Sequence, residues 1–177
     1  MTEKELLRLE FARESKTAKL ELIIGENVYE HQYSEICLPG FGYARDEEGK
    51  LVFIQHAGGV KIGDNVDIRA FVTIDRATIK GEFTEIGEGT KIDHHTHIAH
   101  NVKIGKHNTF ANGCVIEGSC EVGDYNIFGT NVIMQRKTKL GNNCTIGSGS
   151  VITRDIPDNA IVMGVPARVI RFKIQDL

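Results

Sequence analysis

A six-residue repeat runs through most of this 177-residue chain and limits the folds that it can adopt. From Ile62 to Ile152 a large apolar side chain returns at every sixth position, and only Lys80 breaks the series. A smaller side chain stands two positions before most of the large ones. An α-helix with 3.6 residues per turn cannot keep this spacing on one face, and an extended strand has no reason to restart every six residues.

The repeat fits a solenoid in which each hexad supplies one short strand and one corner. Three hexads per triangular coil place each residue above the one 18 positions earlier, at a strand spacing of about 4.8 Å. This register stacks Asn108 with Asn126. It also stacks Asp75 with Asp93, one place after the large position. An inward ammonium at Lys80 would be costly, so we expect the backbone to bulge there and turn Lys80 outward.

Composition narrows the partners and the compartment. The formal net charge is −3 and no long block of Lys or Arg occurs, so we expect no nucleic-acid partner. No segment has the apolar length of a secretory signal or a membrane span, so we expect a cytoplasmic protein without membrane contact. Cys114, Cys120 and Cys144 fall in the small inward position, where a thiol acts as a compact apolar filler.

The stretch KIDHHTHIAHN, residues 91–101, contains four of the seven histidines. Because Ile92 and Ile98 occupy inward positions in the register, the polar residues around them belong to the walls or corners of the coil. We therefore expect surface chemistry here. The four histidines are His94, His95, His97 and His100.

The hexads of residues 58–170 resemble the left-handed parallel β-helix of the hexapeptide-repeat acyltransferases. The resemblance implies an all-β fold and its left hand, which periodicity alone does not show. It also implies a homotrimer with active sites between subunits, because a closed three-fold ring satisfies a heterologous interface. We expect a short helix and an irregular segment in residues 1–59, the left-handed β-helix acyltransferase domain in residues 60–156, and a C-terminal tail in residues 157–177.

One central segment resembles the UDP-3-O-acylglucosamine N-acyltransferases of lipid A synthesis; it reads VTIDRATIKGEFTEIGEGTKIDHHTHIAHNVKIG, residues 72–105. Residues 38–68 extend the likeness. In that family the His of an IAHN run is the general base, and an Asp seven residues earlier assists it. The resemblance implies these catalytic roles for His100 and Asp93. It implies substrate contacts beside them and in the loop GFGYA, namely at His94, His97, Asn101, Phe41 and Tyr43.

The chemistry suits an imidazole. Acyl transfer from a thioester requires the attacking amine or hydroxyl to lose a proton, and a side chain with a pKa near 6.5 can accept it at neutral pH. Asp93 would fix the tautomer, although within one chain it lies on a different side of the triangle from His100. A backbone N–H one coil beyond His100, at Gly118, is the candidate for binding the oxyanion. Spacing alone leaves the alternative that His100 is merely a corner residue.

The ending SVITRDIPDNAIVMGVPARVIRFK, residues 150–173, resembles the terminus of acetyl-coenzyme A users, including sugar-nucleotide N-acetyltransferases and serine acetyltransferases. That likeness implies acetyl-CoA as the acyl donor. It makes Arg154 and Arg168 candidates for phosphate contacts, with Arg136 and Lys137 on an earlier coil. Each of these cations could equally be a solvated surface charge.

The leading hypothesis is therefore an acetyl-CoA-dependent N-acetyltransferase that acts on a small amino sugar, probably nucleotide-linked. A carrier-protein-dependent N-acyltransferase of the lipid A type is the alternative, and we expect the chain to lack that enzyme's N-terminal nucleotide-binding domain and C-terminal helical extension. Gamma-class carbonic anhydrases share the solenoid, but their zinc-ligand pair falls in another register here, so we expect no metal. A solenoid that binds without catalysis remains the non-enzymatic alternative.

Overall fold

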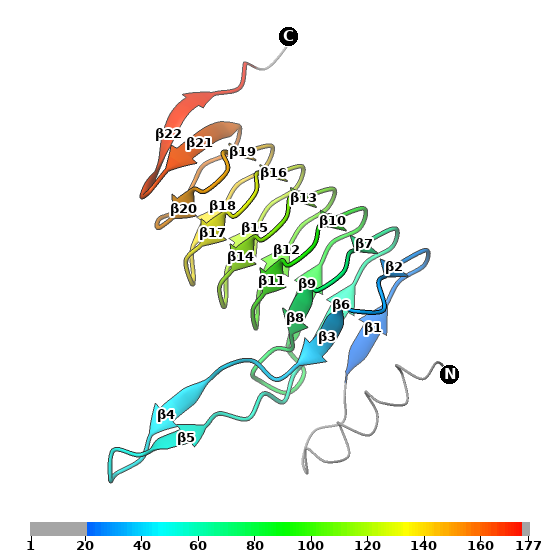
Figure 1. Cartoon of the computed structure of the whole chain (residues 1–177), viewed down its shortest axis with the longest axis vertical. Helices are drawn as coiled ribbons and strands as arrows, with labels where there is room; N and C mark the ends of the chain where they lie inside the picture. The colour runs from blue at the N-terminus through cyan, green and yellow to red at the C-terminus, as the bar shows by residue number, and fades with distance from the viewer. Residues whose placement is uncertain (1–20, 175–177) are drawn as a thin grey trace.

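The computed structural model describes residues 21–174 as a parallel β-helix built from very short strands. Figure 1 shows the strands stacked coil on coil along one axis, with the N-terminal and C-terminal coils at opposite ends. Three sheets form the sides of the coil, and the chain visits them in turn. Across the described residues, no helix is long and apolar enough to cross a membrane.

The three sheets contain the following strands. Sheet A contains β1 (Leu22–Ile24), β6 (Gly59–Ile62), β9 (Phe83–Ile86), β12 (Lys103–Ile104), β15 (Glu121–Val122) and β18 (Lys139–Leu140). Sheet B contains β2 (Tyr29–Glu30), β7 (Asp67–Ile68), β10 (Lys91–Ile92), β13 (Thr109–Phe110), β16 (Ile127–Phe128), β19 (Thr145–Ile146), β21 (Ala160–Gly164) and β22 (Ala167–Phe172). Sheet C contains β3 (Glu35–Leu38), β8 (Thr73–Asp75), β11 (His97–Ile98), β14 (Val115–Ile116), β17 (Ile133–Met134) and β20 (Val151–Ile152).

The large apolar residues of the hexads point into the coil and form one continuous core. Phe110 and Phe128 stack on successive coils with ring centroids 4.3 Å apart. Fully burying one such side chain stabilises the fold by about 1.5–3 kcal/mol. The predicted inward packing is confirmed, and the buried side chains include the thiols of Cys114, Cys120 and Cys144.

The small inward position also carries a buried amide ladder. The backbone N–H of Asn126 donates to Asn108 Oδ1 over 2.9 Å, and the N–H of Cys144 donates to Asn126 Oδ1 over 2.7 Å. Because a buried N–H without an acceptor is costly, these side chains satisfy backbone groups that the short strands leave unpaired. The predicted stacking of Asn108 with Asn126 is confirmed.

One coil is longer than the others. From β10 onward the strands pair 18 residues apart, as in Lys91 with Thr109. Below β10 the offset is 24 residues, as in Ile74 with Ile98. The extra hexad leaves the coil as a loop between β8 and β9, which confirms the predicted bulge with Lys80 exposed to solvent.

This long coil overturns one expectation of the 18-residue register. Since Ile74 pairs with Ile98, Asp75 lies in register with Ala99 on sheet C and not with Asp93. Asp93 follows β10 on sheet B. The expected stacking of the two carboxylates is therefore wrong, and Asp75 belongs to the same side of the coil as the IAHN run.

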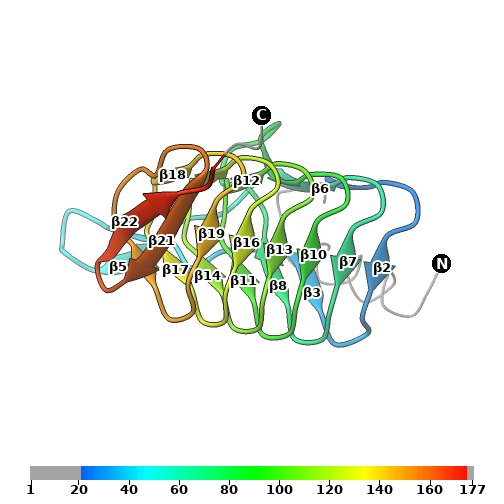
Figure 2. The same cartoon turned by 90° about the horizontal axis from the view of Figure 1, so that it is seen from above.

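The β-helix extends beyond both expected boundaries. Strands β1, β2 and β3 pair with β6, β7 and β8, so residues 22–38 form the first coil and not an irregular segment. At the other end β21 joins β19 in sheet B and turns back into antiparallel β22, beyond the expected end at residue 156 (Figure 2). The expected N-terminal helix, residues 4–13, lies outside the described residues.

Between β3 and β6 the chain leaves the coil as a hairpin. The hairpin consists of β4 (Tyr43–Arg45) and β5 (Leu51–Phe53), paired antiparallel, and it projects from the N-terminal half of the stack (Figure 1). We call residues 39–58 the arm. All six residues of β4 and β5 are exposed, and apolar side chains dominate the two strands.

Candidate active site

The corner between sheets C and A carries the IAHN histidine and two arginines in one column. Ile98, Ile116, Met134 and Ile152 pair in sequence on sheet C, so the residues two places later lie above one another at the corner. Backbone bonds connect the same column, because the N–H of Ser119 donates to the carbonyl of His100. The members of the column are His100, Gly118, Arg136 and Arg154.

Hydrogen bonds to Asn101 fix the ring of His100. Asn101 Oδ1 accepts the N–H of Thr78 over 3.0 Å and its hydroxyl over 2.9 Å, while Asn101 Nδ2 donates to Glu82 Oε2 over 2.7 Å. Because Oδ1 can only accept, His100 Nδ1, 3.1 Å away, must carry the hydrogen of that contact. The neutral ring therefore keeps a lone pair on Nε2, as a general base requires.

Gly118 lies directly against the His100 ring. A β-carbon at this position would lie 2.6 Å from Cε1 and 2.7 Å from Nε2 of His100, closer than unbonded atoms approach. Glycine at residue 118 is therefore required for the present ring position. The structure confirms the predicted placement of Gly118 one coil beyond His100, on the Nε2 side of the ring.

A buried carboxyl group accompanies this corner. Asp75 is 6 % exposed, and its Oδ2 lies 3.7 Å from His97 Nε2. The other ring nitrogen of His97 shares a 2.8 Å hydrogen bond with Thr73 Oγ1. Burial raises the pKa of Asp75 to about 6, against an opposing effect of nearby His100. Burial, followed by His100, lowers the pKa of His97.

A second histidine, missed from the sequence, lies under the corner. His56 is 1 % exposed, and its Nδ1 accepts the N–H of Gly40 over 2.9 Å. Its ring meets that of His100 edge to face, with centroids 5.1 Å apart. Burial is the first cause that lowers the pKa of His56, and the neighbouring positive charges of His100 and Arg76 lower it further. His56 is therefore a neutral neighbour of the proposed base.

The arm connects His56 to solvent through a series of aromatic contacts. Phe53 stacks on His56 with centroids 6.4 Å apart, and Tyr43 meets Phe53 at 5.5 Å. Phe41 meets Tyr43 at 5.1 Å and is 91 % exposed. The two arm residues predicted from the GFGYA loop therefore lie on a path of rings that ends at His100.

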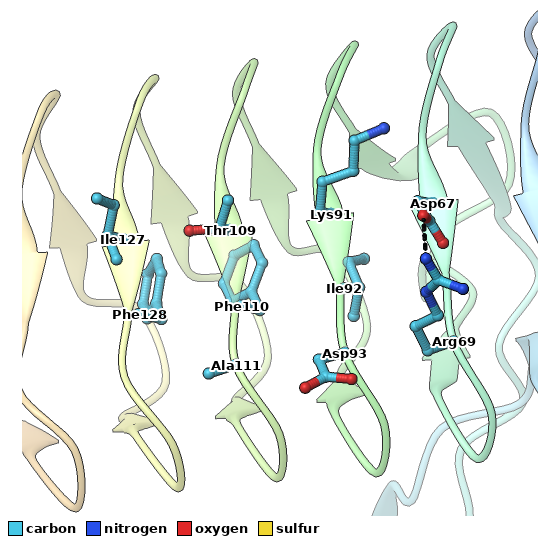
Figure 3. A pocket seen from close by; sticks show the side chains of 10 residues that line it. All are labelled: Asp67, Arg69, Lys91, Ile92, Asp93, Thr109, Phe110, Ala111, Ile127 and Phe128. Carbon is cyan, nitrogen blue, oxygen red and sulfur yellow. Dashed lines mark hydrogen bonds and ion pairs between the residues drawn. The ribbon is translucent and has the colours of Figure 1, made fainter.

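Asp93 and His94 lie away from this corner. Asp93 Oδ1 accepts the backbone N–H of His94 over 2.8 Å and also contacts His94 Nδ1. The bond from the His94 backbone is the main cause that lowers the pKa of Asp93. Figure 3 shows Asp93 beside a depression of about 390 Å³ on sheet B, near Arg69. In the described part of the chain no bond joins Asp93 to His100, so one chain alone does not form the expected pair.

The predicted phosphate contacts separate into two groups. Arg136, Lys137 and Arg154 are exposed at the corner above Gly118, and the N–H of Lys137 donates to the carbonyl of Gly118. Arg168 lies on β22 of sheet B, where its guanidinium donates to the carbonyl of Ala167. The structure therefore brings three of the four cations to the His100 corner.

Metal-ligating side chains do not cluster in residues 21–174. Within that range no group of three or more His, Cys, Asp or Glu side chains is placed to hold a metal ion. The zinc alternative therefore finds no ligand set there.

Comparison with known proteins agrees with the repeat seen in the structure. The family model described as "Bacterial transferase hexapeptide (six repeats)" matches residues 83–118 and 119–154. The chain is a hexapeptide-repeat protein.

Curated relatives of this hexapeptide-repeat protein carry one name. A UDP-3-O-acylglucosamine N-acyltransferase of Rhizobium meliloti is 43% identical over 88% of the chain and 43% of its own length. The enzyme of that name from Shewanella denitrificans is 46% identical over 75% of the chain and 38% of its own length. The chain thus spans less than half the length of these relatives.

Solved structures confirm the predicted fold class, an all-β left-handed parallel β-helix. LpxA from Acinetobacter baumannii matches with a TM-score of 0.74 and 28% identity over 85% of the chain and 56% of its own length. A perosamine N-acetyltransferase from Caulobacter crescentus matches with a TM-score of 0.60 and 19% identity over 92% and 63%. At that identity the second likeness concerns the fold alone.

Proposed function

We propose that this protein transfers an acyl group from a thioester to the amine of a nucleotide-linked amino sugar, with His100 as the general base. The observation that carries the proposal is the fixed ring of His100, whose Nδ1 is tied to Asn101 while Nε2 lies beside Gly118. Relatives 43% and 46% identical are named as N-acyltransferases of a UDP-linked sugar, which supports the reaction class.

In the proposed reaction His100 Nε2 accepts a proton from the acceptor amine while the amine nitrogen bonds to the thioester carbonyl carbon. The carbonyl oxygen gains negative charge, and the N–H of Gly118 is the group assigned to bind it. When the C–S bond breaks, the imidazolium returns its proton to the leaving thiolate. The overall products are an amide and a free thiol, and no further reactant is required.

The corner column supplies a path for the donor. Three coils separate His100 from Arg154, which at a strand spacing of about 4.8 Å amounts to roughly 14 Å. An extended pantetheine chain with its thioester at His100 can therefore direct its phosphates toward Arg136 and Arg154. Arginine suits this role because its guanidinium donates two parallel bonds to phosphate oxygens. This arrangement favours a coenzyme A thioester, and acetyl-CoA in particular.

A donor carried by an acyl-carrier protein is the second candidate. The identity with UDP-3-O-acylglucosamine N-acyltransferases favours it, because the sequence resemblance to that family implies a carrier-protein donor. For the acceptor, Phe41 and Tyr43 offer an exposed aromatic surface next to the path that leads to His100. A homotrimer would bring another copy to this corner and complete the cleft, which a coil filled by its own core cannot enclose.

The test measures thiol release by the purified protein with UDP-linked and GDP-linked amino sugars. Acetyl-CoA and an acylated carrier protein are compared as donors. Replacing His100 with Asn is expected to lower turnover at least 100-fold with the preferred donor. His107→Asn is the matched control, because His107 is also an exposed corner histidine and lies on another corner, stacked on Tyr125.

The outcomes separate the candidates. Consumption of acetyl-CoA supports the leading proposal, and consumption of the carrier-bound donor alone supports the second. Turnover that survives in His100→Asn at the level of His107→Asn would contradict the role of His100 in both.

A further inference from the structure

The reaction described above leaves one buried acid without a role. Asp75 is 6 % exposed, directly beside the half-buried corner at which His100 lies. Taking an ionised carboxylate out of water is costly, and a cationic neighbour offsets that cost. The groups that face Asp75 from the surrounding elements are His56 in the arm, Arg76 next in sequence, His97 on β11 and His100 at the corner.

The backbone closes tightly over this carboxyl group. A β-carbon on Gly40 would lie 2.9 Å from Asp75 Oδ2 and 2.5 Å from His56 Cε1. Residue 40 therefore packs directly on both side chains, and it also donates its N–H to His56. The first strands of the arm segment thus shield Asp75 from water on the side away from His100.

The histidines around Asp75 differ in their freedom to become charged. His56 accepts a backbone N–H at Nδ1, and burial lowers its pKa. His97 is held through Thr73, and its pKa is also lowered by burial. His100 is the third, and its charge interacts with Asp75, His56 and His97 alike. A positive charge in this cluster is therefore most readily accommodated on His100.

We propose that Asp75 is a positioning residue for His100, whose carboxylate stabilises the imidazolium that forms as His100 takes the acceptor's proton. The inference rests on the function proposed above and assigns to Asp75 the part that the sequence resemblance gave to Asp93. The proton moves from the amine to His100 Nε2 and then to the thiolate, while Asp75 stays ionised throughout. Its pKa of about 6 leaves it largely ionised at neutral pH.

The six-residue insertion explains why this role escapes a regular register. Asp75 lies 25 residues before His100, so an 18-residue coil would place it on another side of the triangle. The 24-residue offset aligns Thr73 with His97 and Ile74 with Ile98, which moves Asp75 next to the IAHN run. The loop that lengthens the coil also supplies Thr78, which helps hold Asn101 and through it His100.

The experiment measures the pKa of His100 by NMR in protein labelled at the histidine rings. Asp75→Asn is compared with wild type, and Asp67→Asn is the matched control, because Asp67 is a partly buried carboxylate on sheet B paired with Arg69. Removing a nearby negative charge disfavours the charged imidazole, so Asp75→Asn should lower the pKa of His100 by about one unit. Asp67→Asn should leave it unchanged.

Kinetics give the second readout where turnover is found. The acidic limb of the pH profile of kcat/KM should move to lower pH in Asp75→Asn by the same amount, and kcat should fall about tenfold. The NMR titration needs no substrate, so it tests Asp75 even when no tested donor is consumed. An unchanged pKa of His100 in folded Asp75→Asn overturns the inference while leaving the proposed function standing.

A reciprocal measurement covers the case in which Asp75→Asn fails to fold. In His100→Asn the carboxyl carbon of Asp75 is titrated instead. Because the positive charge of His100 now lowers the pKa of Asp75, that pKa should rise when the charge is removed. The same pKa in His100→Asn and wild type would overturn the inference.

Discussion

Gly118→Ala offers the sharpest geometric test of the site. The added β-carbon would lie 2.6 Å from His100 Cε1, whereas unbonded carbon atoms approach to about 3.5–4.0 Å. The ring must therefore move by about 1 Å, which stretches or breaks its 3.1 Å hydrogen bond to Asn101. A displacement of that size at a reacting group can lower the rate about 100-fold, equivalent to about 2.7 kcal/mol in the activation barrier.

The assay is steady-state turnover together with thermal unfolding. Since the ring is half-buried and can shift, Gly118→Ala should lose turnover with little change in melting temperature. The same substitution in a His100→Asn background should then cost little further, because its effect acts through the ring. Full turnover in Gly118→Ala, or an equal loss in both backgrounds, would refute the reasoning.

Three further predictions concern the donor path, the amide ladder and the buried acid. Replacing Arg136 and Arg154 together with Gln should raise the KM for acetyl-CoA about tenfold or more with a smaller effect on kcat, because the two charges lie remote from the reacting bond; steady-state kinetics with an unchanged KM would speak against the path. Asn126→Ala removes the acceptor of the Cys144 N–H and should cost about 1–3 kcal/mol in urea unfolding. A neutral result there would show that the ladder adds no stability. The pKa of Asp75 is raised from 3.8 to about 6, so its contribution to stability is present below pH 3.8 and lost as the pH rises through 6. Relative to wild type, Asp75→Asn should gain up to about 3 kcal/mol of unfolding free energy between pH 4 and pH 7, and parallel unfolding curves would contradict this.

The sequence was sufficient to predict the coil because its period is a direct consequence of strand and corner geometry. Each large residue, from Ile62 to Ile152, had to face inward for the hexads to close, and it does. The first coil was missed because residues 22–38 contain few hexad matches, and their pairing with β6, β7 and β8 depends on long-range contacts.

The site was predicted in part for a physical reason. His100, Asn101 and Gly118 lie in the regular region, where a fixed 18-residue step places them correctly. Asp75 and His56 precede or interrupt that region, and an inserted hexad changes the step to 24 residues. Lys80 was the visible signal: a charge in an inward position marks the hexad that leaves the coil, and with it every earlier residue changes its neighbour.

The tautomer of His100 tests the central claim most directly. Nitrogen-15 NMR of the histidine rings at a pH above 8 reports which ring nitrogen of the neutral imidazole carries the hydrogen. The structure predicts the hydrogen on Nδ1, held by Asn101, with Nε2 unprotonated beside Gly118. A neutral His100 with its hydrogen on Nε2 could not accept a proton there, and that result would contradict its assignment as the general base.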